Sequence, residues 1–395
     1  MSSPALPDDE LAAWLRLVGT PGVGRDSVRR LLAAFGSAEA VFAADERAWR
    51  TVVVPAVAAA LREPIAGHDR LVAGVLAWRA AQPARRVMVL GEPDYPEQLL
   101  NTADPPLLLY LEGDTSLLAA RSVAVVGSRR PTPQGRENAR RFAVALAREG
   151  WTVVSGLAAG IDAAAHEGAL QAGERGGRTI AVIGTGIDKV YPAHHATLQR
   201  HLLGQGGLVV SELPLGAPPL ARHFPQRNRI IAGLARGTLV VEAALRSGSL
   251  ITARLAVEAG REVMVVPGSI LAEQSAGGHE LIRQGATLVV SVEQVLEALG
   301  MPAATPVSAA GDVHGGVDGD AEVGDDGREN GDERPGAEAD DEVLRALGHD
   351  PTSLDALIAR CGWPAPALNA HLLTLELAGL VARLPGGLYQ RIATG

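Results

Sequence analysis

Short, almost continuous runs of Val, Ile and Leu recur through the centre of the chain. Runs of this length without polar alternation are typical of strands buried on both faces. Stretches with helical character, such as Glu137–Glu149 and Ile251–Ala259, lie between most of the runs. This alternation predicts a parallel, doubly wound α/β sheet. The runs are Val123–Gly127, Thr152–Ser155, Thr179–Gly184, Leu208–Ser211, Thr238–Glu242, Val263–Val266 and Thr287–Val290, and two further candidate strands, Val87–Leu90 and Leu107–Leu111, precede them.

The region before this core, about residues 9–80, has a helical pattern. Within it, Pro21-Gly22-Val23-Gly24 separates two helical stretches. This is the pattern of a helix-hairpin-helix, in which the hairpin amides and the next helix N-terminus can face a phosphate. A simple helical bundle with a glycine turn explains the pattern equally well, and both readings stay open here.

The last segment of the chain predicts a winged helix. Three short helices, Glu342–Leu347, Ser353–Ala359 and Ala365–Leu377, precede a β-wing at Leu380–Arg391, which turns at Pro385-Gly386-Gly387. The third helix, usually the groove reader, contains no Arg or Lys. Such a helix makes poor contacts with phosphates and guanine. We therefore expect this domain to contact protein rather than to read duplex sequence.

Charge is distributed unevenly along the chain. The net charge of the whole chain is −9, and residues 311–340 alone hold eleven carboxylates against two arginines. Residues 121–300 hold eighteen arginines and one lysine against fourteen carboxylates, so the central region is mildly basic. The acidic balance therefore does not argue against an anionic partner.

The acidic stretch also marks a boundary. Residues 302–340 are rich in Gly and Asp and lack aromatic residues, which predicts a disordered linker. We expect a solvated tether; an acidic strand that competes with nucleic acid for a basic groove is the alternative. The predicted division is a helical domain over 1–82, an α/β domain over 83–301, the linker over 302–340 and a winged helix over 341–395.

Several classes of protein are excluded by simple patterns. No apolar run reaches the roughly 18 residues of a membrane span, so we expect no membrane partner. The acidic N-terminus lacks a signal pattern, which predicts a cytoplasmic location. The single cysteine, Cys361, cannot form an intrachain disulfide, and no Cys/His cluster has the spacing of a zinc site.

Four glycine-bearing turns follow the predicted strands, at the edge of the sheet where ligands bind in such folds. They read VAVVGSRRPTPQG, VVSGLAAGIDAAAH, IGTGIDKVYPAHH and VVEAALRSGSLITA. One such turn is weak evidence, because glycine is used there for steric reasons alone. Four turns that also carry Ser, Arg and Lys predict a phosphate-lined groove. Neither the G-x-G-x-x-G fingerprint nor a Walker A sequence is present, so we expect no nucleotide cofactor.

Three further features bear on chemistry. The segment ARHFPQRNRIIAGL places Phe224 among arginines, as in a single-strand platform, although Phe224 in the core is the alternative. Lys189 is the only lysine in the chain. Either an ammonium group is required at this position, or a single lysine remains there by chance. Asp162 and His166 share a helix face; structural hydrogen bonding is a commoner explanation of such a pair than acid/base catalysis. In the first turn, Thr132 and Pro133 predict a helix start.

The ordered series GSR, SGLAAGIDAAAH, GTGIDKVYP, FPQRNRIIAGL, VVEAALRSGSLITA, VPG and LIRQGA, over about residues 85–295, resembles the DprA/Smf family of DNA-processing proteins. The resemblance implies an extended Rossmann-like domain that is not an enzyme. It also implies binding and protection of single-stranded DNA, homodimerisation, and loading of the RecA recombinase in natural transformation. His195 and His279 stand where the family usually has Asn, which puts their role as ligands in doubt.

Carried over position by position, the resemblance implies a DNA pocket with no catalytic or metal-binding residues. It comprises Gly127, Ser128, Arg129, Ser155, Gly156, Lys189, Phe224, Arg227, Asn228, Arg229, Ser247, Gly248 and Ser249.

Two rival functions remain. Rossmann-like phosphoribohydrolases share the glycine-lined edge, but their catalytic Glu follows a glycine turn, whereas Glu242 here precedes one. A transcription factor that acts through the winged helix is the other, and the cation-free third helix counts against it.

Overall fold

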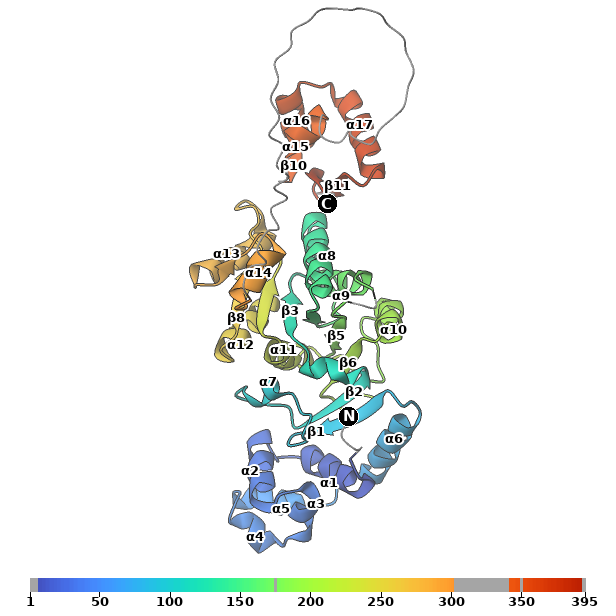
Figure 1. The fold of residues 1–395 in the computed structure, drawn as a ribbon, viewed down its shortest axis with the longest axis vertical. Coiled ribbons are helices and arrows are strands. Elements are labelled where there is room, and N and C mark those ends of the chain that lie inside the picture. The colour runs from blue at the N-terminus through green and yellow to red at the C-terminus, as the bar shows by residue number, and fades with distance from the viewer. Residues whose placement is uncertain (1–5, 174–175, 302–340, 349–350, 393–395) are drawn as a thin grey trace, which may run out of the picture. The chain divides into compact units, whose positions relative to one another are not determined.

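The computed structural model describes residues 6–173, 176–301, 341–348 and 351–392 (Figure 1). The chain divides into two compact units, Met1–Met301 and Pro302–Gly395, and each is described by itself. The predicted linker, 302–340, lies outside the described residues. The proposed four-domain division therefore stays a prediction, although the helical, α/β and winged-helix parts each have a fold of their own.

The first unit is built on one nine-stranded sheet with the order β1-β2-β6-β5-β4-β3-β7-β8-β9. The pairs β1–β2 and β2–β6 are antiparallel, and every other neighbouring pair is parallel. This confirms the predicted α/β class. The strands are β1 (Arg85–Val89), β2 (Leu108–Gly113), β3 (Ser122–Val126), β4 (Thr152–Ser155), β5 (Thr179–Val182), β6 (Leu208–Ser211), β7 (Gly237–Val240), β8 (Glu262–Val265) and β9 (Thr287–Leu288).

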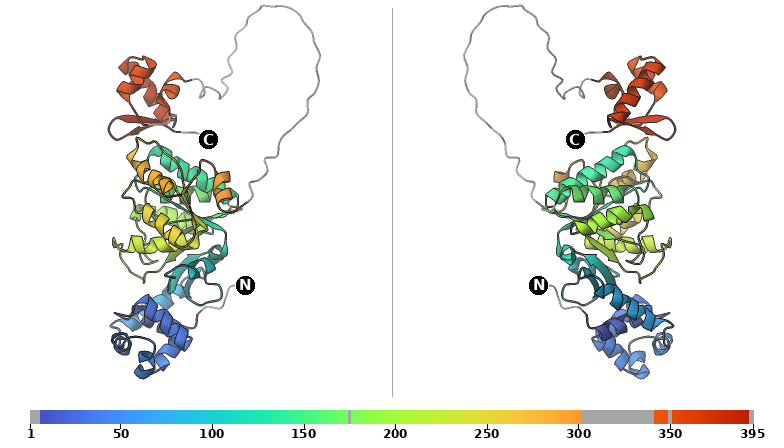
Figure 2. Two further views of the ribbon diagram at one scale, coloured as in Figure 1. Left: turned by 90° about the vertical axis from the view of Figure 1, so that its left-hand side faces the viewer. Right: turned by 90° about the vertical axis from the view of Figure 1, so that its right-hand side faces the viewer.

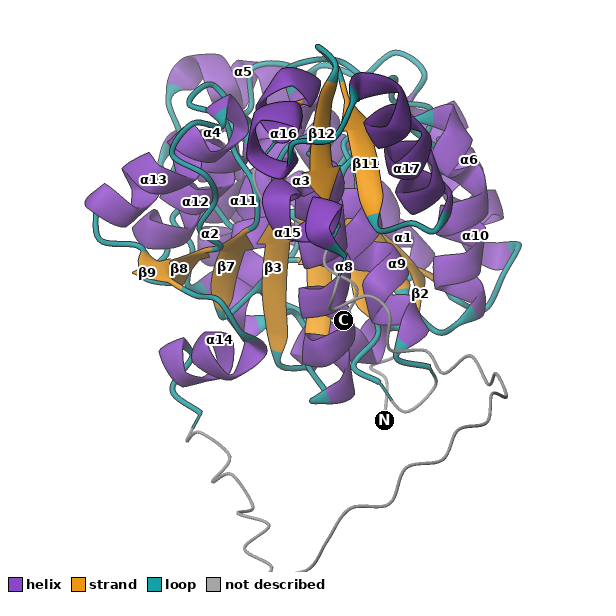
Figure 3. Ribbon diagram, turned by 90° about the horizontal axis from the view of Figure 1, so that it is seen from above, coloured by secondary structure: helices purple, strands orange, loops and turns teal. Residues whose placement is uncertain are grey.

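Helices cover both faces of the sheet, which explains the continuous apolar strands. One core cluster joins α8, α9 and α14 to one face, and another joins α11 and α12 to the opposite face (Figure 3). The helices are α7 (Glu97–Leu100), α8 (Pro133–Arg148), α9 (Ile161–Gln171), α10 (Ala196–Gly204), α11 (His223–Leu234), α12 (Ser249–Glu258), α13 (Ala276–Arg283) and α14 (Val292–Ala298). Helix α8 begins four residues before the predicted stretch, at the Thr132–Pro133 start that the sequence indicates, and the Thr132 side chain caps it.

The strand order contains one reversal point, which positions the candidate site. From β3 the chain steps outward through β4, β5 and β6, and then returns to add β7, β8 and β9 on the other side of β3. The loops after β3 and β7 therefore leave the sheet toward opposite faces. In open α/β sheets this divergence creates the crevice in which ligands bind.

Six helices precede the sheet and gather at its β1–β2 end (Figure 2). They are α1 (Asp8–Gly19), α2 (Arg25–Phe35), α3 (Ala38–Ala43), α4 (Glu46–Arg50), α5 (Pro55–Arg62) and α6 (His68–Ala80). Their apolar faces share a core with β1 and β2, where Trp78 and Tyr110 meet edge to face. The hairpin between α1 and α2 turns at Gly22, whose φ of +82° favours glycine.

The second unit has the predicted winged-helix fold. Leucines of α17 and residues of α15 and α16 form a small core with Val381 and Tyr389 of the wing. Leu373 and Leu377 of α17 point outward and are 56% and 82% exposed. The elements are α15 (Glu342–Leu347), β10 (Thr352–Ser353), α16 (Leu354–Cys361), α17 (Ala365–Leu377), β11 (Val381–Leu384) and β12 (Leu388–Arg391), with the sheet order β10-β12-β11.

Candidate nucleic-acid interface

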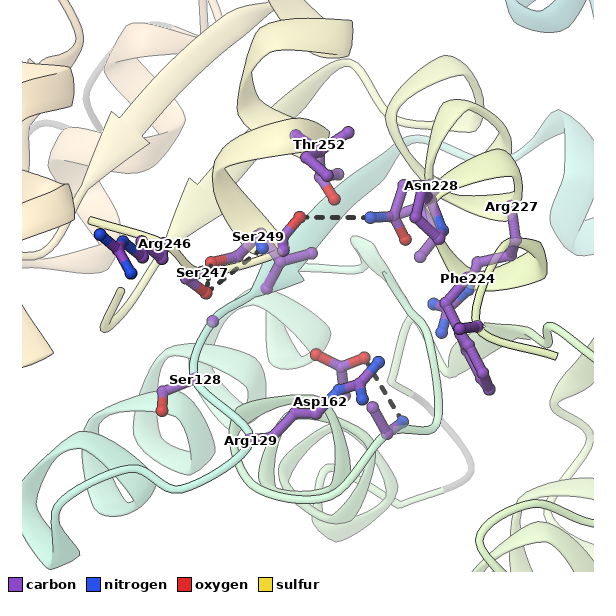
Figure 4. Close-up of a pocket in the computed structure, with 18 of the residues that line it drawn as sticks. Ser128, Arg129, Asp162, Phe224, Arg227, Asn228, Arg246, Ser247, Ser249 and Thr252 are labelled. Carbon is purple, nitrogen blue, oxygen red and sulfur yellow. Dashed lines mark hydrogen bonds between the residues drawn. The ribbon is translucent and has the colours of Figure 1, made fainter. Parts of the chain in front are cut away.

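A cavity of about 740 Å³ opens between the loops that follow β3 and β7, and helix α11 forms its third wall (Figure 4). We call it the β3–β7 pocket. Residues 127–130 after β3 and residues 246–249 before and at the start of α12 line two sides. Asp162, Phe224, Arg227 and Asn228 complete the wall. The pocket thus lies at the reversal point of the sheet.

The turn after β3 is held tightly against the turn after β7. The Ser128 N–H donates to the Glu242 carbonyl at 2.6 Å. A Cβ at Gly127 would lie 2.8 Å from that carbonyl and 2.7 Å from the Ile161 side chain, so this approach requires glycine. The two glycine turns therefore form one rigid edge rather than two separate loops.

Glu242 has a local structural role. Its carboxylate accepts the Thr132 N–H at 3.0 Å and the Thr132 hydroxyl at 2.7 Å, at the start of α8. Burial raises the pKa of this carboxyl, and the bonds from Thr132 oppose the shift. Glu242 is absent from the pocket wall. The geometry therefore assigns it to the helix start rather than to chemistry in the cavity.

Arg227 is the buried cation of the pocket, with only 7% of its surface exposed. Burial lowers its pKa to about 10, and the charge of Asp162 opposes this shift, so the guanidinium stays protonated at neutral pH. Its Nε has no hydrogen-bond partner in the structure. A Cβ at Gly156 would lie 1.4 Å from Arg227 Nη1, so glycine at 156 makes room for this side chain.

Asp162 supports the opposite wall. Its carboxylate accepts the N–H of Gly156 at 3.1 Å and of Ala158 at 3.4 Å. Burial raises the pKa of Asp162, while Arg227 and these two N–H groups act in the other direction. Asp162 thereby fixes the loop after β4 at the pocket floor.

The start of α12 is tied to α11. Asn228 Nδ2 donates to the Gly248 carbonyl at 3.3 Å, and the hydroxyls of Ser247 and Ser249 are 2.7 Å apart. The N-terminus of α12 therefore opens toward the cavity, beside two hydroxyls (Figure 4). A helix N-terminus carries partial positive charge and free N–H groups, which favour an anion.

Cations and rings share the rim of the pocket. Arg129, Arg130 and Arg246 are exposed, and none of them forms an ion pair within the described residues. The Arg129 guanidinium lies 5.3 Å from the centroid of the half-buried Phe224 ring, and the Tyr191 ring lies 5.5 Å from it. Guanidinium groups without ion pairs beside two neighbouring rings, whose planes are tilted by 43°, suit a phosphate backbone and its bases.

The structure brings most of the sequence-predicted residues together and places four elsewhere. Ser155 is buried behind the pocket and donates to the Val125 carbonyl at 2.7 Å. Gly156 lies beneath Arg227, and Lys189 is exposed on the loop after β5, outside the pocket wall. Arg229 pairs with carboxylates on the other side of α11. The residues that line the cavity are Gly127, Ser128, Arg129, Phe224, Arg227, Asn228, Ser247, Gly248 and Ser249.

Sequence reasoning missed several residues of the wall. Arg130 and Arg246 lie next to predicted residues in the same glycine turns. This position in the sequence is the signal by which they could have been included in the predicted site. Tyr191 follows Lys189 in the third turn, and Thr252 lies one helical turn after Ser249. Their inclusion adds two cations, a ring and a hydroxyl to the predicted set.

His166 and His195 both bond the backbone of Leu157, which has a strained conformation. The Leu157 N–H donates to His166 Nε2 at 3.3 Å, and His195 Nδ1 donates to the Leu157 carbonyl at 2.9 Å. Leu157 has a φ of +54°, which is unfavourable for a branched side chain. The Thr179 hydroxyl gives its proton to the Val153 carbonyl at 2.6 Å, so it accepts from His166 Nδ1 at 2.7 Å.

This arrangement needs a neutral His166. Burial lowers its pKa to about 3, and the charge of Arg227 adds to the effect. Asp162 and His166 thus serve separate hydrogen-bond networks, in agreement with the structural explanation of their spacing. His279 Nε2 lies 3.0 Å from the Gly268 carbonyl, outside the pocket wall.

Within the described ranges, no group of three or more His, Cys, Asp or Glu side chains is arranged to hold a metal ion. Over the same residues, no helix combines the length and apolarity that a bilayer crossing requires.

Comparison with known families matches three parts of the chain. Residues 86–300 match "DNA recombination-mediator protein A", residues 8–62 match the "DprA-like N-terminal HHH domain", and residues 328–387 match the "DprA winged helix domain". Of the two readings of the N-terminal helices, the helix-hairpin-helix is therefore confirmed.

Individual relatives agree. The chain is 44% identical to Protein Smf of Escherichia coli over 306 residues, which cover 78% of this chain and 77% of that protein. It is 51% identical to DNA processing protein DprA of Streptococcus pneumoniae over 202 residues, covering 51% of this chain and 70% of that one. The crystal structure of the Streptococcus pneumoniae DprA matches with a TM-score of 0.63 at 36% identity, over 74% of this chain and 98% of that one. By its sequence and by its fold, the chain belongs to the DprA/Smf family of DNA-processing proteins.

Proposed function

We propose that the chain binds single-stranded DNA in the β3–β7 pocket, without catalysis, and delivers that DNA to the RecA recombinase. The observation that carries the binding step is the convergence of Arg129, Arg130 and Arg246 with the N-terminus of α12 on one cavity. None of these three cations forms an ion pair within the described residues, although the charge of Arg129 also acts on Asp162, and all three are exposed to an approaching phosphate.

The rings favour a single strand over a duplex. Phe224 and Tyr191 lie at the rim of the cavity, where their faces can meet a base. A stacked base pair presents its edge to a protein rather than its face. An unpaired base exposes its face and can stack on a ring there, and such stacking tolerates every base. The pocket also falls within the range of about 300 to 1,000 Å³ that is typical of small-ligand sites, a size suited to single nucleotide units of a strand.

The side chains of the pocket offer little support for hydrolysis. Glu242, the residue that a phosphoribohydrolase-type reading would use, is bonded to Thr132 and lies outside the wall. Asp162 is the carboxylate in the wall, and two backbone N–H groups occupy it. Incubation with nucleoside monophosphates tests this directly, since release of free base would support the phosphoribohydrolase function instead.

Delivery to RecA and homodimerisation rest on the family resemblance, and so do protection of incoming DNA in natural transformation and a cytoplasmic location. For delivery, we expect the chain to accelerate RecA filament formation on single strands, measured as DNA-dependent ATP hydrolysis. For assembly, light scattering should report twice the mass of one chain. A monomeric mass, or no acceleration, would contradict the corresponding step.

The binding step is tested by fluorescence anisotropy with single-stranded and duplex DNA of one sequence, titrated with salt. We expect tight, sequence-tolerant binding that prefers the single strand. Arg129→Ala should weaken binding about tenfold for every sequence and reduce the slope of log K against log salt concentration by about one.

Arg148→Ala is the matched control. It removes the same charge from the last turn of α8, at the opposite edge of the sheet, where Arg148 is exposed. Equal losses in the two variants would mean that overall charge, not the pocket, governs binding. No difference between Arg129→Ala and the unmodified chain would refute the pocket assignment.

A further inference from the structure

Three arginines and two carboxylates meet between the N-terminal helices and α11. Arg25 of α2 lies 2.7 Å from Asp104 and 3.3 Å from Glu212, and Arg29 lies 2.9 Å from Asp104. From the other side, Arg229 of α11 pairs with Glu212 and lies 3.4 Å from Asp104. We call these five residues the α2–α11 charge cluster. Each carboxylate bridges an arginine of α2 to the arginine of α11.

The α11 side of the cluster is shielded from water. The side chains of Arg229 and Glu212 are 14% and 16% exposed, whereas those of Arg25 and Asp104 are 38% and 35% exposed. Burial raises the pKa of the Asp104 carboxyl, but Arg29, Arg229 and Arg25 together hold it below its ordinary value. The Asp104 carboxylate is therefore charged at neutral pH, and the attraction within the cluster is less screened than at a surface pair.

Helix α11 connects this cluster to the β3–β7 pocket. Successive residues of an α-helix are rotated by about 100°, so Arg229 lies about 200° from Arg227. Arg227 and Asn228 line the cavity, and Arg229 faces the cluster. Asn228 also bonds the Gly248 carbonyl, which continues the connection to the start of α12. A shift of α11 would therefore displace two walls of the pocket together.

We propose that Arg229 is a positioning residue, through which the N-terminal helices set the placement of α11 and hence of Arg227 and Asn228 in the pocket. The inference rests on the proposed binding of single-stranded DNA, and it names a residue that holds that site in place. Arg229 does not touch the DNA in this proposal, although the family resemblance places it in the DNA pocket.

The sign of a carboxylate substitution distinguishes positioning from charge. Glu212→Gln removes one negative charge near the groove, so simple electrostatics predicts tighter binding of DNA. Positioning predicts weaker binding, because Arg229 loses its closest partner. We expect single-stranded DNA to bind about fivefold to tenfold more weakly to Glu212→Gln in the full chain. Unchanged or tighter binding would overturn the inference.

The salt dependence gives a second test. Arg229→Ala should weaken binding by a similar factor while keeping the salt slope of the unmodified chain, because no phosphate contact is lost. Arg229→Lys should recover part of the affinity, because an ammonium keeps the charge but lacks the planar fork with which the guanidinium meets both carboxylates. A slope reduced by about one in Arg229→Ala would instead place Arg229 on a phosphate and refute the positioning role.

Glu112→Gln is the matched control. Glu112 pairs with Arg85 at 3.0 Å across β1 and β2, with side chains 11% and 19% exposed, and neither residue belongs to α11. This variant removes the same charge at similar burial and should bind DNA like the unmodified chain. Thermal unfolding of each variant checks that the fold is retained.

Amide hydrogen exchange of α11 separates this inference from the proposed function. In the DNA-free chain, Glu212→Gln should accelerate exchange over residues 223–234, and Glu112→Gln should not. Faster exchange with no DNA binding by the unmodified chain would refute the proposed function alone. Normal binding with unchanged exchange and unchanged affinity in Glu212→Gln would refute the positioning role alone.

Discussion

Among the residues that the structure describes, arginine side chains occur in both the β3–β7 pocket and the α2–α11 charge cluster, but only those of the cluster form ion pairs with carboxylates. Arg129, Arg130 and Arg246 face the pocket without an ion-pair partner within the described residues. Arg25, Arg29 and Arg229 share two carboxylates in the cluster. Arg227 and Arg229 are two residues apart on one helix, yet they belong to different regions. The role of an arginine here is therefore set by carboxylates from distant parts of the chain.

The largest effect should come from filling the space beneath the buried pocket cation. Gly156→Ala would place a methyl group 1.4 Å from the present position of Arg227 Nη1. The guanidinium must therefore move from its present position in the wall of the pocket. We expect loss of single-stranded DNA binding, measured by fluorescence anisotropy, and a loss of about 1 kcal/mol in the free energy of unfolding, measured by urea denaturation. Gly74→Ala in α6 provides the contrast, since no atom lies within 4 Å of its Cβ and its backbone is helical.

Acid should affect the pocket side before the cluster. The folded pKa of His166, about 3, lies below its ordinary value, so the neutral form stabilises the fold above about pH 6.5 and this contribution is lost as the pH falls. At pH 5 the loss is about 2 kcal/mol. The pKa of Asp104 is lowered, so Asp104 stays charged and the cluster weakens only when the pH falls below 3.8, the ordinary pKa of an aspartate.

The measurement is the free energy of unfolding from pH 7 to 4.5, in the unmodified chain and in His166→Gln. Asp162 and Glu242, whose pKa values are raised, contribute equally to both chains, and the difference isolates His166. We expect the unmodified chain to lose more stability than the variant in this range. Identical pH profiles would show that His166 is not the acid-sensitive group.

A carboxylate introduced into the β3–β7 pocket should pair with its arginines, as the carboxylates of the α2–α11 charge cluster do. Ser247→Asp sets a negative charge beside Arg246 and close to the N-terminus of α12. We expect single-stranded DNA to bind about tenfold more weakly, through repulsion of phosphates and pairing with the arginines. Stability should change by less than about 1 kcal/mol, because an acid near a helix N-terminus is favourable. Ser247→Asn is the neutral control, and equal affinities of the two variants would contradict the expectation.

The smallest effect should come from the most redundant member of the cluster. Arg29→Ala leaves Asp104 with Arg25 and Arg229, and the pair that it removes is 27% and 35% exposed. Such a pair contributes less than about 1 kcal/mol, and DNA affinity should not change. A loss of affinity as large as that of Arg229→Ala would show that the cluster acts as one unit, which double-mutant cycles would then resolve.

The pattern of apolar residues predicted the α/β fold and the order of its strands along the chain, because buried parallel strands leave continuous runs. It placed strand ends one or two residues late where a run continues into a turn. The Val123–Gly127 run contains β3, which ends at Val126, and Gly127 already belongs to the turn pinned by Glu242. The pairing order of the strands depends on contacts between distant segments, so the runs alone do not contain it.

The site was predicted where one motif supplies the whole environment, and missed where a distant segment does. Ser128, Arg129 and Ser247 line the pocket because their turns end at the sheet edge. Arg229 lies in the same motif as Arg227, but its surroundings come from Asp104 and Glu212, which lie 125 and 17 residues before it. The sequence analysis placed both arginines in the pocket, because the motif does not show which face of α11 meets the carboxylates.

The reversal of strand order at β3 has a consequence for how the protein is made. The two walls of the pocket, at Ser128 and Ser247, are separated by four strands of the chain. During synthesis, the first wall leaves the ribosome long before the second exists, and domains of this kind fold as units. A nascent chain that ends before α12 therefore has Arg129 in the turn after β3, but it lacks the residues that complete the cavity. Affinity for DNA should appear abruptly with chain length, once β7 has been inserted beside β3.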